Sequence, residues 1–290
     1  ARPAEYGRLS GRAWALGYAG GLLALAICYP LLPRQGQADR GAALGIYAII
    51  AGWYLLFSLP ALAWLPQAAP AADTASLRTA MRRDLRALGA LWRTSPALRV
   101  FTVAYFLYND AVVTVIQFTG MFTQEVLHFS ARDNLWLFLL LNIVAVPGTL
   151  LFGRLFDRLS GVRILQLLML LWTVVVLGAS QVHSRAAFWP VAALAALILG
   201  ATQAASRAQM ARLAPPDASG RAMALLALSG KASAVLGPLL YGLIADAVAQ
   251  STGAATGHRV AIGAFALVFG AAAWILQSTA RHSATPSQKA

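Results

Sequence analysis

Charged residues are scarce in this chain: Asp, Glu, Lys and Arg together make up only 11% of its 290 residues. Soluble globular domains carry about 25% charged residues, so this composition excludes that class. Hydrophobic residues account for 59% of the chain. They recur in runs of about 20 residues, the length needed to cross a bilayer as a helix. The sequence therefore predicts an all-α integral membrane protein, and not the alternating, roughly 10-residue strands of an outer-membrane barrel.

Cysteine is nearly absent, and the groups used in catalysis do not cluster. Cys28 is the single cysteine, which excludes an intramolecular disulfide and a cysteine-based metal cluster. Asp110 is the one acid near the middle of an apolar run, so the sequence offers no pair of carboxylates for acid–base chemistry. The H-E-x-x-H and G-x-S-x-G signatures of metalloproteases and hydrolases are also missing. The sequence predicts no enzyme activity, no metal site and no cofactor.

Eight apolar runs are long enough to span a membrane. They lie at roughly 10–32, 41–65, 97–123, 133–153, 163–182, 186–210, 221–247 and 259–278. Of the 23 basic residues, sixteen fall on one side of the membrane that this count implies, and five fall on the other, namely Arg34, Arg40, Arg132, Arg185 and Arg259. Cytoplasmic loops carry the excess of Lys and Arg, so both termini are predicted to be cytoplasmic. A net charge of +13 that is spread over loops in this way sets orientation, and we expect a lipid bilayer and no nucleic acid as partner.

The longest connection, residues 66–96, contains a basic helical pattern. Its apolar residues recur at helical spacing as Leu77, Met81, Leu85, Leu88 and Trp92. Arginines lie off that stripe, at positions 78, 82, 83 and 86. This pattern predicts an amphipathic helix that lies on the membrane or on the helix bundle. The alternative is a solvated charged linker.

Polar side chains inside the predicted spans are the candidate functional residues, because such residues are costly in lipid and commonly mark substrate or ion pathways. They are Asp110, Gln117, Asn142, Gln203, Arg207 and Lys231. Asp110 is either a proton or substrate site or a buried acid that fixes packing. Arg207 either binds substrate or extends to the interface. Asn142 either binds a ligand or bonds to a neighbouring helix, and Pro147–Gly148 is a hinge or a kink.

One cytoplasmic loop carries a family signature. The stretch "GRLFDRLSGVR" resembles the G-x-x-x-D-R-x-G-R-R/K loop of the major facilitator superfamily, with one extra residue before the second glycine. The matching positions are Gly153, Asp157, Arg158, Gly161 and Arg163. The second, fifth and eighth spans contain no charged residue between their ends, and in that superfamily every third helix is peripheral. In the family this loop changes shape during transport, which is the role that the resemblance implies for it here.

Other stretches resemble the vacuole-effluxer branch of the superfamily, which includes autophagy-related amino-acid effluxers. They are "SGRAWALGYAGG", "FLYNDAVVTVIQFTG", "GATQAASRAQMARLAPP" and "ALSGKASAVLGPLLYGLIAD". The resemblance implies that the eight spans correspond to helices five to twelve of a twelve-helix fold. Residues 1–65 would then be the last two helices of the N-terminal bundle, 66–96 a cytoplasmic linker, 97–279 the C-terminal bundle and 280–290 a cytoplasmic tail.

The resemblance also implies a function: a secondary active transporter that works by alternating access on a small polar solute such as an amino acid, with proton coupling through Asp110 as an option. If the source is bacterial, the expected location is the cytoplasmic membrane. The alternative is a non-transporting scaffold or receptor built on the same helices. Lys231 lies ~15 Å along its helix from Arg221, too deep for easy access to the interface. Because the third and seventh spans would be neighbours in this fold, we hypothesise that Lys231 pairs with Asp110, or shares a water-filled cavity with it, in at least one transport state. The competing explanation is a partner acid in the first four helices of the family fold.

Overall fold

The computed structural model describes residues 2–31, 40–64 and 76–283. Every secondary-structure element in this part of the chain is a helix. The helices are α1 (Tyr6–Cys28), α2 (Arg40–Trp64), α3 (Leu77–Thr94), α4 (Pro96–Leu127), α5 (Ala131–Arg158), α6 (Gly161–Gln181), α7 (Arg185–Leu213), α8 (Ser219–Ser233), α9 (Leu236–Thr252) and α10 (Ala254–Ser283). Short 3-10 turns lie at Pro3–Glu5, Tyr29–Leu31 and Pro216–Ala218. Parts of the predicted linker and tail, residues 66–75 and 284–290, lie outside the described residues.

Eight helical segments in the described part of the chain are long and apolar enough to cross a membrane. The all-α fold with eight spans is thereby confirmed. The seventh span differs from the prediction in one respect, because it consists of two helices, α8 and α9, separated by Ala234 and Val235. This break leaves backbone groups of both helix ends without partners inside their own helix.

Local sequence explains several of the helix starts. Ser130 and Asp133 form a capping box at the start of α5, in which each side chain bonds the other residue's backbone N–H. The Ser184 hydroxyl accepts a hydrogen bond from the Ala187 N–H at the start of α7. Pro96 occupies the first position of α4, where its missing N–H costs nothing.

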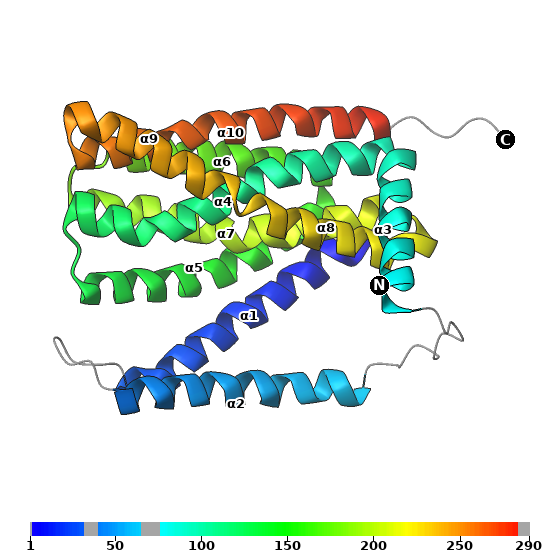
Figure 1. Cartoon of the computed structure of the whole chain (residues 1–290), viewed down its shortest axis with the longest axis horizontal. Coiled ribbons are helices and arrows are strands. Elements are labelled where there is room, and N and C mark those ends of the chain that lie inside the picture. Colours follow the sequence, from blue (N-terminus) through cyan, green and yellow to red (C-terminus); the bar gives the residue numbers. More distant parts are fainter. Residues whose placement is uncertain (1, 32–39, 65–75, 284–290) are drawn as a thin grey trace.

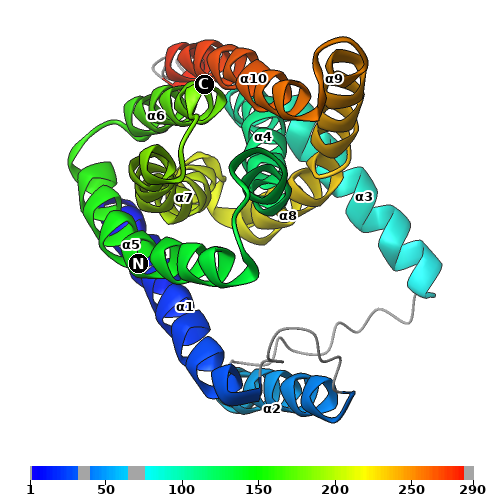
Figure 2. The ribbon, with the colours of Figure 1, turned by 90° about the vertical axis from the view of Figure 1, so that its left-hand side faces the viewer.

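Helices α4 to α10 form one packed group, called here the six-span unit (residues 96–283; Figure 1). In it, α4 and α6 pack against α10, and α5 packs against α7. Helix α1 contacts α5 and α7 as far along as Gly21 and then diverges from the unit toward α2, which contains no buried residue (Figures 1 and 2). The apolar helices α6 and α10 bury one face and expose outer residues such as Leu170 and Leu267, as expected for helices at the periphery.

Helix α3 lies across the ends of the spans instead of parallel to them (Figure 1). The end of the molecule at which α3 lies is called here the α3 end. The N-terminus of α1 and the C-termini of α5 and α7 are at this end as well (Figure 1). The linker residues that carry the amphipathic pattern form the predicted helix, which begins at Leu77.

Gly148 brings α5 and α7 into backbone contact. Helix α5 continues through Pro147 without interruption. A Cβ atom at Gly148 would collide with the carbonyl oxygen of Leu197 and would lie only 3.0 Å from its Cα. The pair Pro147–Gly148 thus serves, in this conformation, to allow close packing of two helices.

Candidate functional site

The break in the seventh span is held by two adjacent side chains of α4. Asn109 donates from Nδ2 to the Gly230 carbonyl, at 3.2 Å, and to the Ser233 hydroxyl, at 3.0 Å, in the last turn of α8. The Asp110 carboxylate accepts the backbone N–H of Gly237, at 2.8 Å, in the first turn of α9. A carboxylate at a helix N-terminus is favoured by the free N–H groups and by the helix dipole. Asn109 and Asp110 together therefore satisfy both sides of the break, and we call this arrangement the α4 clasp.

The α4 clasp continues into α7. Gln203 donates from Nε2 to the Asn109 Oδ1 atom, at 3.3 Å. One turn away, the hydroxyls of Tyr108 and Ser206 are hydrogen-bonded at 2.7 Å. These bonds join α4, α7 and α8 near the middle of the six-span unit. Of the residues that the sequence singled out, Asp110 and Gln203 are brought together through Asn109, which the sequence analysis did not place among the site residues.

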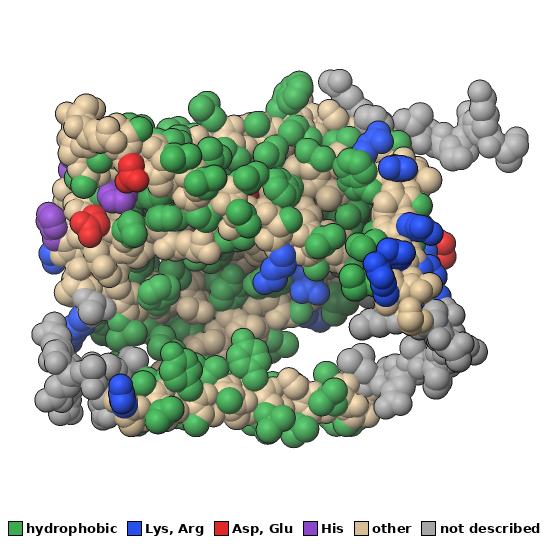
Figure 3. Space-filling view, viewed as in Figure 1, with side chains coloured by type: hydrophobic (Ala, Val, Ile, Leu, Met, Phe, Trp, Pro, Cys, Tyr) green, Lys and Arg blue, Asp and Glu red, His purple; other side chains and the backbone are tan. Residues whose placement is uncertain are grey.

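Lys231 and Arg207 are both exposed, and no hydrogen bond or ion pair reaches either side chain from the described residues. The hypothesised ion pair between Lys231 and Asp110 is therefore not formed in this conformation, in which Asp110 bonds Gly237 instead. In the space-filling view, lysine and arginine side chains gather at the edge of the hollow between the six-span unit and α1 and α2 (Figure 3).

Arg207 lines a cavity of about 340 Å³ between α1 and the six-span unit, called here the inter-helix cavity. Its walls are formed by α1, α7 and α8, through Tyr6, Leu9, Ser10, Ala13, Trp14, Arg207, Ala208, Ala211, Ser219 and Met223. Arg207 is the one charged group among these lining residues. Trp14 contributes to the wall, and its indole Nε1 is buried without a hydrogen-bond partner in the described part of the chain. The exposed guanidinium of Arg207 in this cavity favours a ligand that carries a negative charge.

The other two polar candidates lie apart from the α4 clasp. Gln117 is exposed on α4. Asn142 donates from Nδ2 to the Phe138 carbonyl of its own helix, at 2.8 Å, and its Oδ1 atom faces Gly21 of α1. Thr114, on the same stripe as Asp110, donates its hydroxyl to the Asp110 backbone carbonyl.

Asp157 of the loop signature holds the N-terminus of α1. Its two carboxylate oxygens accept the backbone N–H groups of Gly7 and Arg8, each at 2.8 Å. Arg212 of α7 approaches the same carboxylate at 3.4 Å, donates to the Phe156 carbonyl and stacks over the Phe156 ring at 4.1 Å. This arrangement, the Asp157 latch, joins α1, α5 and α7 at the α3 end.

The glycines of the loop signature permit close helix contacts. Gly153 packs against Gly7 and Gly11, where an added Cβ would lie 2.8 Å from the Gly7 carbonyl oxygen. Gly161 begins α6 against Phe156. Arg158 and Arg163 are exposed, in accord with their position in a charged loop.

From the sequence, Arg212 was only one of the sixteen basic residues on the predicted cytoplasmic side, with no indication of its place in the latch. A basic residue at a helix end is common, and its spacing from Asp157 in the sequence carries no signal of their contact. The part of the contact between α1 and α5 that the sequence could indicate is the set of glycines at positions 7, 11 and 153, because small residues allow helices to approach closely.

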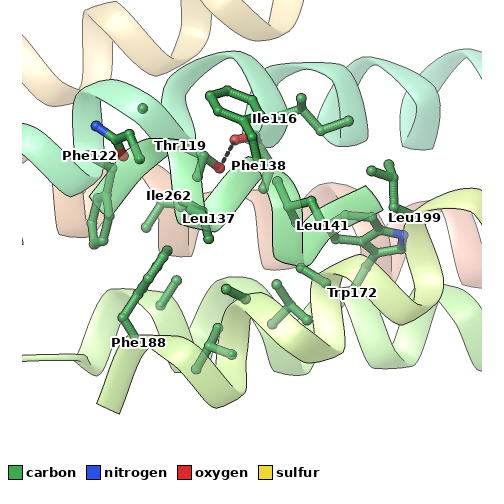
Figure 4. A pocket seen from close by; sticks show the side chains of 18 residues that line it. Ile116, Thr119, Phe122, Leu137, Phe138, Leu141, Trp172, Phe188, Leu199 and Ile262 are labelled. Carbon is green, nitrogen blue, oxygen red and sulfur yellow. Dashed lines mark hydrogen bonds between the residues drawn. The ribbon is translucent and has the colours of Figure 1, made fainter. Parts of the chain in front are cut away.

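A second cavity, of about 50 Å³, lies inside the six-span unit between α4, α5 and α7 (Figure 4). Its walls are almost entirely apolar, with Ile116, Phe138, Leu141 and Trp172 among the residues that point into it. The Thr119 hydroxyl there donates to the Val115 carbonyl of its own helix. This small cavity offers no charged group for catalysis or metal binding, and no cluster of three metal-ligating side chains occurs in the residues that the structure describes.

Comparisons with known proteins place this geometry in context. A family model described as "Vacuole effluxer Atg22 like" matches residues 4–275. The MFS-type transporter YxiO of Bacillus subtilis is 25% identical over 250 residues, covering 84% of this chain and 58% of that protein. Autophagy-related protein 22 of Neurospora crassa is 23% identical over 271 residues, covering 83% of this chain and 36% of that protein. The chain thus spans less than two thirds of each relative.

Among solved structures, the human organic anion transporter MFSD10 superposes with a TM-score of 0.70 at 16% identity, covering 96% of this chain and 65% of that one. Similarity at this level establishes the fold. The predicted major facilitator architecture of the eight spans is therefore confirmed.

Proposed function

We propose, because the chain belongs to the vacuole effluxer Atg22-like family, that it forms the larger part of a secondary active transporter that works by alternating access. The family is one of membrane transporters, which confirms that the chain is not an enzyme. The protein is a multi-pass integral membrane protein. The observation that carries the transport proposal is the inter-helix cavity, which lies between α1 and the six-span unit and is lined by the charged side chain of Arg207.

Alternating access requires that contacts between helix groups form and break in turn. The Asp157 latch is such a contact, because it joins α1 to α5 and α7 at the α3 end. At the opposite end α1 diverges from the six-span unit (Figure 1). This asymmetry supports a conformation that is closed at the α3 end. A scaffold or receptor, the alternative function, would have no need for a charged cavity at this junction.

The substrate proposed for the inter-helix cavity is a small solute with a carboxylate, such as an amino acid. Arginine binds carboxylates through two parallel hydrogen bonds, and Arg207 is positioned in the cavity to make them. Cavities of about 300–1,000 Å³ are typical of small-molecule sites, and the volume of about 340 Å³ falls in that range. The ligand would bridge α1 and α7. Its binding would therefore affect the contact between α1 and the six-span unit, which must break during alternating access.

Replacing Arg207 by glutamine is expected to weaken amino-acid binding about 10- to 100-fold, because a hydrogen bond to a charged group contributes about 1.5–3 kcal/mol. The measurement is ligand-induced thermal stabilisation of purified protein, with L-amino acids compared with their amides, which lack the carboxylate. Arg132→Gln, which changes an exposed arginine outside the cavity, is the matched control. Equal stabilisation by acids and amides would contradict the carboxylate assignment.

We further propose that the α3 end is cytoplasmic, as the distribution of basic residues indicates. Ser160, in the connection between α5 and α6 at the α3 end, is exposed. With Cys28 replaced by serine, Ser160→Cys should react with a membrane-impermeant maleimide only after the cells are permeabilised. His183→Cys, at the opposite end, should react in intact cells. The reverse pattern would invert the topology.

Proton coupling, in this proposal, acts through Asp110. Protonation would weaken the carboxylate as an acceptor for the Gly237 N–H and so loosen the break between α8 and α9. It would also end any attraction to Lys231 in another transport state. Asp110→Asn keeps an oxygen acceptor but cannot titrate, so the transport rate in proteoliposomes should lose its pH dependence. Asp246→Asn, an exposed acid in α9, should leave the pH profile unchanged. A pH profile that survives Asp110→Asn would exclude this role.

A further inference from the structure

Helix α3 presents an unoccupied surface at the ends of the spans. Its contacts with the six-span unit are made with α4 and α8. Viewed along the spans, its N-terminal part extends beyond the unit (Figure 2). A helix that lies across the ends of membrane-spanning helices lies in the plane of one leaflet, near the lipid headgroups.

Burial divides the apolar residues of α3 into two sets. Leu91 is buried against the unit, with 8% of its surface exposed. Met81, Leu85 and Trp92 remain exposed, at 61%, 53% and 37%. Their spacings of four and seven residues place these three side chains along one line of the helix, ~16 Å in length. The unit therefore covers one side of α3 and leaves a separate apolar stripe exposed, along which the Trp92 ring is contacted by the guanidinium of Arg99, 5.9 Å from the ring centroid.

A basic face borders this stripe. Arg78, Arg82, Arg86 and Arg93 follow the apolar positions around the helix at ~100° per residue, so they lie together on its next face. They are exposed, and no ion pair to an acid is formed by any of these four in the described residues. The one acid of α3, Asp84, is 3.9 Å from Arg83 instead. The positive charge of the face is thus uncompensated.

We propose that this surface of α3, formed by Met81, Leu85 and Trp92 with Arg78, Arg82 and Arg86, binds anionic phospholipids of the adjacent leaflet. The apolar stripe inserts among the acyl chains, and the arginines bond the lipid phosphates. An acidic protein segment would match the charge, but it would leave the stripe in water. A bilayer matches both the charge and the apolar stripe. Because α3 lies across the ends of the spans, its arginines and its apolar stripe lie at the depth of the headgroups. The inference is independent of what the protein transports.

The insertion can be tested with a fluorescent bimane attached at Leu85→Cys in the full chain with Cys28 replaced by serine. In nanodiscs that contain phosphatidylglycerol, acyl-chain bromine should quench the label and aqueous iodide should not. In nanodiscs of phosphatidylcholine alone, or at high salt, quenching by bromine should fall, because screening weakens attraction to the headgroups. Access of iodide in the phosphatidylglycerol discs would overturn the proposal. Protection from both quenchers would overturn it as well, because it would mean that protein covers the stripe.

The charge requirement can be tested by affinity for a soluble short-chain phosphatidylglycerol in detergent. Arg82→Gln with Arg86→Gln should weaken its binding on the order of 30-fold, given the contribution of each basic residue near an anionic surface. Arg40→Gln with Arg132→Gln removes the same charge from exposed positions at the opposite end and should leave the affinity unchanged. Equal losses in the two double variants would show a non-specific charge effect and would overturn the site.

Discussion

Replacing Gly148 by alanine is expected to separate α5 from α7 and to lower the apparent melting temperature of the protein by roughly 5–10 °C. The added methyl group would meet the backbone of Leu197, which cannot turn away as a side chain could. Overpacking of this kind costs about 1–3 kcal/mol even where side chains can adjust. Since α5 also contacts α1, the shift would reach the inter-helix cavity as well.

The matched control for Gly148 is Gly242 in α9. An added Cβ at Gly242 meets no neighbouring atom, and alanine favours the helix by up to about 1 kcal/mol relative to glycine. Gly242→Ala should therefore leave the melting temperature unchanged or raise it slightly. Thermal unfolding of purified protein, followed by fluorescence, measures both variants. Similar destabilisation by the two would mean that glycine flexibility matters and that the contact with Leu197 does not.

The second large effect is expected at Asp157. In Asp157→Ala, α1 loses a charged acceptor for two N–H groups at its N-terminus, and Arg212 loses its ionic partner. At about 1.5–3 kcal/mol for each bond to a charged acceptor, the closed form should lose more than ~100-fold in relative population. The α3 end should then open.

Spin labels on the exposed residues Arg12 and Arg163 can report this opening by pulsed electron resonance. Asp157→Ala should lengthen and broaden the distance between them. Asp157→Asn keeps one oxygen and should show a smaller change. Asp217→Ala, an exposed acid near the same end, should leave the distance distribution as it is. An unchanged distance in Asp157→Ala would mean that helix packing, and not the Asp157 latch, holds the end closed.

Hydrophobicity and charge were sufficient to predict the eight spans, because the cost of exposing polar groups to lipid acts on each segment separately. The start of α5 at Ser130 and the helix in the linker follow from equally local patterns. The break at Ala234 and Val235 also has a local cause, because Pro238 has no N–H and its ring would clash with the carbonyl group of Ala234, four residues earlier. What the local sequence does not indicate is that Asn109 and Asp110, far away in the sequence, bond the helix ends on either side of the break.

The residues of the candidate site could largely be predicted from the sequence, whereas the contacts between them could not. Asp110, Gln203 and Arg207 were detectable as polar residues in apolar runs. The partner of Asp110 was not detectable, because Gly237 offers only a backbone N–H. Gln117 shares a face with Asp110 by periodicity, yet it is exposed two helix turns beyond the clasp. Periodicity assigns a face of a helix, and only the neighbouring helices determine what lies opposite each residue.

The α4 clasp also bears on how the protein is made. Asp110 and Gly237 are 127 residues apart, so α4 leaves the ribosome long before its partner exists. An aspartate at the centre of a membrane helix costs about 2.5–3.5 kcal/mol on insertion scales. During synthesis, α4 must therefore remain near the insertion machinery or in contact with water until α9 arrives. Nascent chains that stop before residue 237 should hold α4 in the bilayer less securely than longer ones.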